Sequence, residues 1–211
     1  AYRFPVRWSE MTRNYFRKTG AKLGGELGDA MRRFAEDPED EAAADRLARE
    51  SSYVGTTRTT CVATQLEAGH AENALPQRAS ATVNCRILPG VDPASVQATL
   101  AEVVADDGVK ITPVAEPKPS PPSPLTEEVM APIQEITESM WPGVKVVPNM
   151  STGATDGLYF RNAGIPVYGV SGLFGDIDDV RAHGRDERIM VQAFFEGLEF
   201  LDRLVRAYTS E

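Results

Sequence analysis

Apolar residues recur at helical spacing along much of this chain, and they alternate with polar residues over two short stretches. Residues 1–50 are polar overall, but apolar side chains return every three to four positions, which predicts helices. These apolar positions are Trp8, Met11, Tyr15, Phe16, Met31 and Phe34. Residues 36–49, rich in acids and alanine, are predicted to form a solvated helical face.

Two stretches rich in β-branched residues, 58–66 and 79–88, predict strands. The loop between them contains Gly, Asn and Pro and favours an antiparallel hairpin. A helix is expected next, because Asp92 supplies an N-cap and Pro93 a first-turn proline. Residues 109–111 predict a returning edge strand. This order of elements is that of a β-α-β-β-α-β sandwich that lacks its first strand.

Six prolines within residues 112–124 predict an extended connector, since proline neither continues a helix nor donates to a central strand. Beyond it, the pattern alternates between helices at residues 126–140, 156–162 and 187–207 and strands at 144–147 and 166–170. The last helix carries an apolar stripe that is expected to pack on another element, made of Met190, Phe194, Leu198, Leu201 and Val205. Two strands do not make a sheet alone, so we expect the C-terminal portion of a larger chain.

Composition narrows the possible partners. The 211 residues include 31 acids and 22 bases, a formal charge of -9, and this disfavours binding to nucleic acid or to anionic lipid. No run approaches eighteen apolar residues, so no membrane span is expected. The N-terminal residues do not have the pattern of a secretory signal. The compartment is left open, because any leader would lie upstream.

Two cysteines, Cys61 and Cys85, are too few for a disulfide scaffold and lack the C-x-x-C spacing of zinc or redox sites. One interpretation is a pair of buried thiols that behave as apolar side chains. The other depends on the register of the hairpin: if the two residues lie opposite each other, an oxidising compartment can join them.

The candidates for chemistry are few, because the chain has two histidines, His70 and His183. His183 lies in a polar loop before the last helix and is either a metal ligand or an exposed histidine; zinc needs three or four protein ligands. The small-residue loop at 151–157 opens a helix. Its N–H groups are suited to a carboxylate or another anion. The alternative is that Thr155 or Asp156 simply caps that helix.

Two further polar residues have alternative interpretations. Arg86 lies within the second predicted strand and is either a solvent-facing arginine or a donor aimed at an anion. Asn73 either shapes a turn through its own backbone or faces a ligand.

Five motifs follow one another along the chain: Gly69-x-x-x-Asn73-x-x-Pro76, Ala81 to Gly90, Gly153-Ala154-Thr155-Asp156, Gly164-Ile165-Pro166 and His183-Gly184-x-Asp186-Glu187. In this order they resemble the M20 family of metallopeptidases, which includes aminoacylases, carboxypeptidase-S-like enzymes and succinyl-diaminopimelate desuccinylases. Residues 121–125 and the last motif look most like the carboxypeptidase-S and N-acyl-amino-acid hydrolase branch. The resemblance covers about residues 58–206.

The resemblance implies an α/β fold in two parts. Members of the family have a di-zinc α/β catalytic domain that is interrupted by a ferredoxin-like α+β lid, through which they dimerise. Residues 1–115 would then be an incomplete lid or dimerisation domain without its first strand. Residues 116–211 would be the C-terminal part of the catalytic domain.

The resemblance also implies roles for single residues. Asn73 and Arg86 match the catalytic pair of the lid, which binds the substrate carbonyl or carboxylate and commonly reaches across the dimer. The candidate substrate-binding residues are Gly153, Thr155, Asp156, Arg161 and His70. Arg161 is included because Leu158 stands where relatives often carry an arginine. His183 matches the metal ligand that the family supplies late in the chain.

The function implied is that of a zinc-dependent hydrolase, with two zinc ions, acting on a small peptide or an N-acyl amino acid, in a homodimer. The family's His-x-Asp pair, bridging Asp and Glu-Glu pair do not occur at the expected places and should lie upstream, so this chain alone is expected to be an inactive C-terminal fragment. The alternative is a non-catalytic ferredoxin-like module for dimerisation or small-molecule binding.

Overall fold

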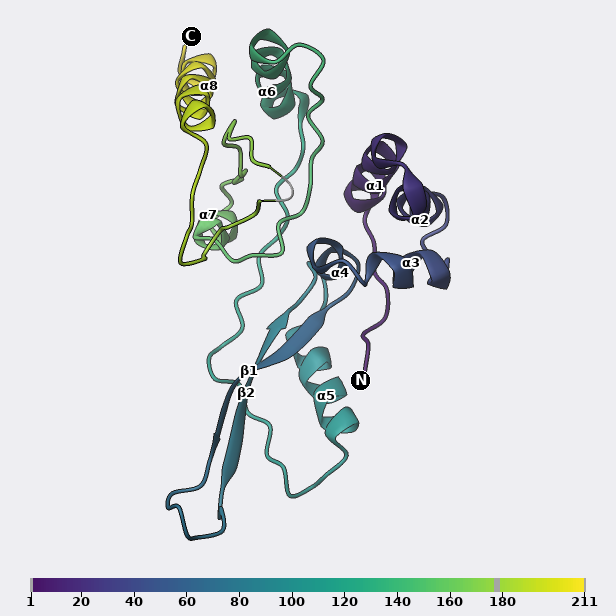
Figure 1. The fold of residues 1–211 in the computed structure, drawn as a ribbon, viewed down its shortest axis with the longest axis vertical. Coiled ribbons are helices and arrows are strands. Elements are labelled where there is room, and N and C mark those ends of the chain that lie inside the picture. Colours follow the sequence, from purple (N-terminus) through teal and green to yellow (C-terminus); the bar gives the residue numbers. More distant parts are fainter. Residues whose placement is uncertain (1, 177–178, 211) are drawn as a thin grey trace. The chain divides into compact units, whose positions relative to one another are not determined.

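The computed structural model describes residues 2–176 and 179–210, and within them it shows a mixed α/β fold with a small sheet (Figure 1). The chain divides into two compact units, one of Ala1–Pro121 with Pro148–Asn162 and the other of Pro122–Val147 with Ala163–Glu211. Each unit has a hydrophobic core of its own. The assignment of residues 1–115 to a lid and 116–211 to a catalytic domain stays a prediction. It concerns the functional role of each domain, whereas the two compact units are defined by contacts within the chain.

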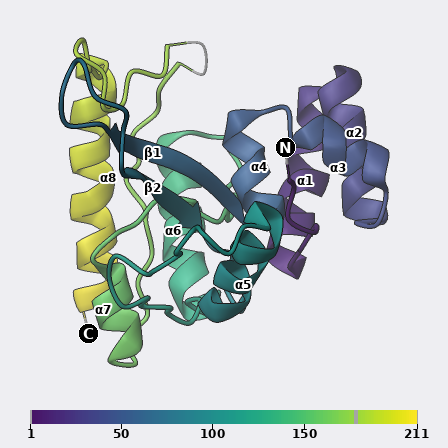
Figure 2. The same cartoon turned by 90° about the horizontal axis from the view of Figure 1, so that it is seen from below.

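The first unit begins with an extended arm followed by four helices, which confirms the helical prediction for the N-terminal residues. The helices are α1 (Glu10–Leu23), α2 (Gly25–Glu36), α3 (Glu41–Leu47) and α4 (Ser51–Thr57). Side chains cap two of them: the N–H of Thr12 donates to Ser9 Oγ at 3.2 Å, and that of Ala43 donates to Asp40 Oδ1 at 3.0 Å. Figure 2 shows α1, α2 and α3 packed together.

The core of this unit lies among α1, α2 and α3. Phe16, Met31 and Phe34 are fully buried there, as their spacing predicts. Trp8 is different, since it precedes α1 and is 48% exposed. The solvated face predicted for residues 36–49 is wrong on one side of α3, where alanines and a leucine are buried. Small side chains let this helix approach its neighbours closely.

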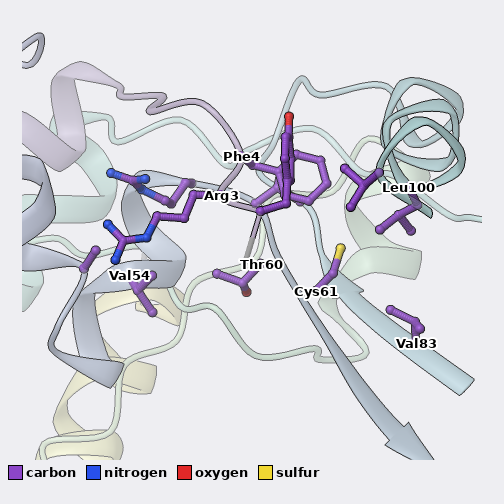
Figure 3. A pocket seen from close by; sticks show the side chains of 12 residues that line it. Arg3, Phe4, Val54, Thr60, Cys61, Val83 and Leu100 are labelled. Atoms are coloured by element: carbon purple, nitrogen blue, oxygen red, sulfur yellow. The ribbon is translucent and has the colours of Figure 1, made fainter. Parts of the chain in front are cut away.

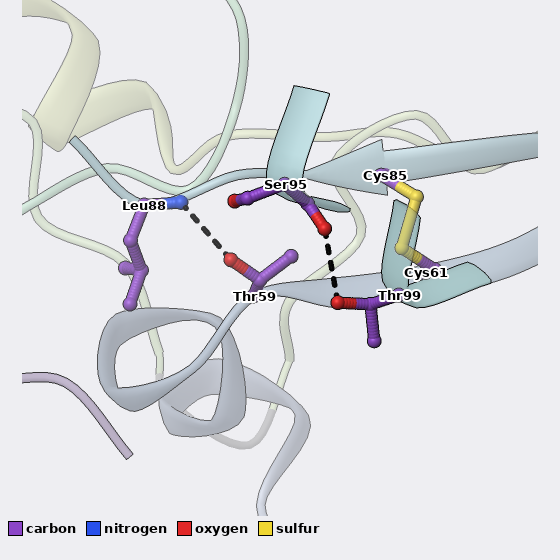
Figure 4. The surroundings of a disulfide bond; sticks show 6 residues. All are labelled: Thr59, Cys61, Cys85, Leu88, Ser95 and Thr99. Carbon is purple, nitrogen blue, oxygen red and sulfur yellow. Dashed lines mark hydrogen bonds between the residues drawn. A yellow bond between two sulfur atoms is a disulfide. The ribbon is translucent and has the colours of Figure 1, made fainter. Parts of the chain in front are cut away.

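The hairpin is confirmed: β1 (Thr60–Ala68) pairs antiparallel with β2 (Ala79–Arg86), and a bulge interrupts the register near Ala63. Cys61 lies directly opposite Cys85, their Cα atoms are 4.1 Å apart, and a disulfide joins them (Figure 4). Both cysteines are half-buried. The interpretation as buried free thiols is therefore wrong, and the conditional pairing is the one that holds.

Helix α5 (Pro93–Val104) follows the hairpin, and the N–H of Ala94 donates to Asp92 Oδ1 at 3.0 Å, as the cap predicts. The edge strand predicted at residues 109–111 is wrong, because the sheet of the described residues has two strands. Gln97 Nε2 donates to the carbonyl of Ile111 at 3.4 Å, so this segment is held by a side chain of α5. The ferredoxin-like arrangement thus stays an expectation.

Residues 112–124 have no helix or strand, as their six prolines predict. Helix α6 (Glu127–Met140) and α8 (Val191–Thr209) form the second unit, and α7 (Gly157–Asn162) belongs to the first. The last helix begins at Val191 rather than at residue 187 as predicted.

The strands predicted at residues 144–147 and 166–170 are also wrong, since both segments are irregular. In residues 166–170 the backbone makes hydrogen bonds with a side chain rather than with a neighbouring strand. The N–H of Val167 donates to Ser123 Oγ, and that hydroxyl donates to the carbonyl of Val167, each at 2.8 Å. One serine of the connector therefore satisfies both backbone groups of this residue.

The core of the second unit is formed where α6 meets α8. The buried face of α8 consists of Ala193, Gly197, Phe200 and Leu204. The predicted stripe from Met190 to Val205 lies on a neighbouring face and is exposed among the described residues, so the expectation that it packs on another element stays a prediction. Among the described residues, no helix has the length and hydrophobicity needed to cross a membrane.

Candidate functional site

Arg86, the last residue of β2, contacts the small-residue loop at 151–157. Its Nη1 donates to the carbonyl of Thr152 at 3.0 Å and to Thr152 Oγ1 at 3.3 Å. The guanidinium is exposed, and two of its hydrogen-bond contacts are made within the protein. Arg86 therefore places a positive charge at the start of this loop.

The loop is organised by its own hydroxyl groups. The N–H of Gly153 donates to Ser151 Oγ at 3.3 Å, and the N–H of Gly157 donates to Thr155 Oγ1 at 3.3 Å at the start of α7. Gly153, Thr155 and Asp156 are all exposed. Three candidate substrate-binding residues thus lie together on an accessible loop that Arg86 contacts.

The sequence pattern did not indicate Gly55 of α4, which packs against the same loop. A Cβ at position 55 would lie 2.9 Å from Thr152 Cγ2 and 3.3 Å from its Cβ. No side chain larger than hydrogen fits there without moving Thr152. The glycine and Arg86 thus hold Thr152 from two sides, although both are distant from it in sequence.

Replacing Gly55 with alanine is expected to shift Thr152 by a few tenths of an ångström and to weaken its bond with Arg86. In the substrate-binding loop that the family resemblance implies, a misplacement of this kind is expected to lower kcat/KM by roughly tenfold. Alanine favours the helix, so α4 itself should not be destabilised. Steady-state kinetics of the intact protein would test this. Thr152→Ser removes the clashing methyl group and should restore activity to the Gly55→Ala protein; no rescue would contradict the proposed contact.

Arg161 of α7 contacts the proline-rich connector. Its Nε and Nη2 donate to Ser120 Oγ at 3.1 and 2.9 Å. This arginine therefore ties α7 to the connector, and its role in binding a substrate carboxylate stays a prediction.

His70 and Asn73 lie in the turn at the far end of the hairpin, and both are exposed. Arg86 pairs with Thr60 at one end of the hairpin, whereas Ala68 pairs with Ala79 at the other. Seven steps along a strand separate these ends, or roughly 23 Å. The fold therefore does not bring Asn73 and Arg86 together within one chain.

His183 belongs to the second unit and lies in a turn with its backbone in the left-handed region, at φ 64°. Its N–H donates to Glu187 Oε1 at 2.9 Å, and its side chain is exposed. Of the acids nearby, Asp186 pairs with Arg181. Asp179 pairs with Arg181 at 2.5 Å and with Arg188 at 2.7 Å, and hydrogen bonds from these two arginines lower the pKa of Asp179.

The described residues do not form a zinc site by themselves. No group of three or more His, Cys, Asp or Glu side chains lies close enough to hold a metal in the part of the chain that the structure describes. Structural and catalytic zinc sites use three or four such ligands. Of the described acids near His183, Asp179 and Asp186 pair with arginines, and Glu187 accepts from a backbone N–H. The donor set of the described residues therefore does not fit zinc without further ligands.

Residues 13–112, which include most of the helices, the hairpin and α5, match the family model described as "Peptidase dimerisation domain". The chain is 31% identical over 153 residues to the human "N-fatty-acyl-amino acid synthase/hydrolase PM20D1", covering 71% of this chain and 30% of that protein. It is 28% identical over 151 residues to "Probable carboxypeptidase S-like 2" of Dictyostelium discoideum, covering 71% and 29%.

A solved structure, the M20 family metallo-carboxypeptidase Sso-CP2 from Sulfolobus solfataricus, shares the fold with a TM-score of 0.60 and 19% identity, covering 96% of this chain and 46% of that one. These matches confirm the resemblance to the M20 peptidases: residues 13–112 match the dimerisation-domain family, and the relatives named above are hydrolases by their names. The chain spans about a third of the length of the curated relatives.

Proposed function

We propose that the protein containing this chain is a zinc-dependent hydrolase of N-acyl amino acids or of C-terminal peptide bonds. The observation that carries the proposal is the contact of Arg86 with the exposed 151–157 loop. A fixed guanidinium beside a loop of small residues offers donors and positive charge to a carboxylate. The names of the relatives, an N-fatty-acyl-amino acid hydrolase and a carboxypeptidase, describe substrates that carry such a carboxylate.

In this proposal the chain binds and orients the substrate. Arg86 and the loop residues Gly153, Thr155 and Asp156 hold the carboxylate or carbonyl end, and a donor aimed at a developing oxyanion lowers the barrier. Asn73 and His70, at the far end of the hairpin, act at the site of a partner subunit, which accounts for their distance from Arg86. The match to a dimerisation domain supports such a homodimer.

The metal centre is proposed to depend on residues outside this chain. His183 contributes one ligand, and the other ligands of two zinc ions belong to the part of the protein that the relatives have and this chain does not span. The solved relative is a metallo-carboxypeptidase, and this supports a metal requirement. The 211 residues alone are accordingly proposed to be inactive.

A second candidate is a non-catalytic module for dimerisation or small-molecule binding. It is favoured by the match of residues 13–112 to a dimerisation domain and by the lack of a metal-binding cluster among the described residues. Under this alternative the protein hydrolyses neither N-acyl amino acids nor peptides.

Replacing His183 with alanine in the intact protein is expected to lower kcat by at least about a hundredfold and to reduce the bound zinc, as the loss of a ligand weakens metal binding. Hydrolysis of N-acyl amino acids would be measured together with the metal content. Arg185→Ala, in the same exposed loop, is the matched control and should stay within about twofold of wild type. Full activity after exhaustive chelation would contradict the zinc-dependent mechanism.

A further inference from the structure

The first unit contains a pocket of about 380 Å³ that none of the candidate site residues lines. It is enclosed by the N-terminal arm, the junction of α4 with β1, the start of the hairpin, and α5. Its lining combines two arginines, Arg3 and Arg58, with apolar side chains, among them Phe4, Val54, Leu100 and Val103. Figure 3 shows Phe4 on the side of Leu100 and Arg3 on the side of Val54.

The arm that forms one wall of this pocket is fixed in place. The N–H of Arg7 donates to the carbonyl of Thr57 at 2.8 Å, and Val6 packs against the core of the helices. The rings of Tyr2 and Phe4 meet edge to face with centroids 5.2 Å apart. The pocket is thus preformed, and its volume is at the lower end of the range for small-molecule sites.

Arg58 is a buried cation with a hydrogen-bond donor left over. The residue is 8% exposed, and its Nε is buried with no hydrogen-bond partner among the described residues. Its Nη2 lies 3.4 Å from Asp45 Oδ1, longer than the roughly 2.7–2.9 Å of a charge-assisted bond. A buried donor without a partner is costly. This Nε is closed to solvent, so a ligand in the pocket gains affinity from it only where the surrounding side chains shift.

The charges around the pocket are unequal. Arg3 Nη1 donates to the same oxygen, Asp45 Oδ1, at 2.8 Å. Two guanidinium groups therefore share one carboxylate oxygen, which leaves one positive charge in excess among these three residues. This excess charge borders an apolar wall.

We propose that this pocket binds a small carboxylate with a short apolar chain. The carboxylate accepts from Arg58 and Arg3, and the chain lies against Phe4, Leu100 and Val103. The arginines recognise the negative charge of the ligand through hydrogen bonds. The apolar wall buries the hydrocarbon chain of the ligand and so removes its surface from water. The inference does not depend on the proposed hydrolysis, because Arg86 and Thr152 do not line this pocket.

Isothermal titration of the intact protein with butanoate, hexanoate and octanoate would test the inference, with hexan-1-ol as the uncharged control. Affinity is expected to rise by up to about fourfold for each methylene until the apolar part is filled. Hexanoate should bind more tightly than hexan-1-ol.

Replacement of Asp45 gives the sharpest test, because only a ligand-binding role of the arginines predicts tighter binding when their carboxylate partner is removed. Asp45→Asn frees both guanidinium groups and is expected to tighten hexanoate binding by about two- to fivefold, whereas Arg3→Gln should weaken it by a similar factor. Both side chains are at least half exposed, so both variants should fold. Arg58→Lys, which shortens the buried donor, should abolish the preference for hexanoate if it folds.

Three results would overturn the inference. Equal binding of hexanoate and hexan-1-ol would show that the arginines do not recognise the charge. Hexanoate binding that is unchanged in Asp45→Asn and Arg3→Gln would place the ligand elsewhere. The third result is that hexanoate does not bind and that a structure of the intact protein shows another partner at Arg58 Nε. That partner would be an ordered water or an acidic side chain of another segment.

Discussion

Replacing Phe34 with alanine is expected to lower the free energy of unfolding of the first unit by about 3–5 kcal/mol. Phe34 is fully buried, and its ring meets that of Phe16 edge to face with centroids 5.5 Å apart. Phe16 in turn meets Tyr53 at 5.7 Å, so the three rings form one cluster that joins α1, α2 and α4. Alanine would leave a cavity that these rigid rings fill poorly.

Native-state hydrogen exchange of the amides in α1 and α2 would measure this loss. Phe34→Leu is the matched control, because it keeps most of the buried apolar volume and should cost clearly less, about 1–2 kcal/mol. If the amides of α1 and α2 are as well protected from exchange in the Phe34→Ala protein as in the wild type, the packing described for this core is incorrect.

Removing the Cys61–Cys85 disulfide is expected to cost about 3 kcal/mol in the stability of the hairpin region. The bond closes a segment with a sequence separation of 24, so breaking it restores conformational freedom to the unfolded chain. The double replacement Cys61→Ala with Cys85→Ala would be compared with wild type by urea unfolding.

A reducing agent provides the internal control. It should lower the midpoint of unfolding of wild type to that of the double variant, and it should leave the double variant unchanged. Two free thiols in the native, unreduced protein, or an unfolding midpoint that does not respond to reduction, would contradict this prediction.

Elements with local signals could be predicted from the sequence. Asp92 and Pro93 mark the start of α5 within a few residues, and alternation with β-branched residues marks both strands. The three other predicted strands failed because a strand exists only with a partner that its own sequence does not specify. At Val167 the partner is a serine hydroxyl 44 residues away, so the segment does not form a sheet.

The candidate site was predictable only in part. The motifs indicated Arg86 and the 151–157 loop separately, but their contact spans 66 residues and has no local signal. Gly55 was missed for the same reason, since only the packing of Thr152 shows why a side chain is excluded there. The sequence pattern identified an apolar stripe on α8, but it did not identify which face of the helix packs within this chain. The neighbouring face is the one that packs on α6.

The covalent link between the two strands has a practical consequence for the turn at residues 69–78, which is exposed throughout. Exposed loop tips of this kind are preferred cleavage sites for proteases. Because Cys61 and Cys85 lie on either side of the turn, a cut there would leave both fragments joined. Such nicked molecules would migrate as the intact polypeptide on a non-reducing gel and would separate into two bands after thiol treatment.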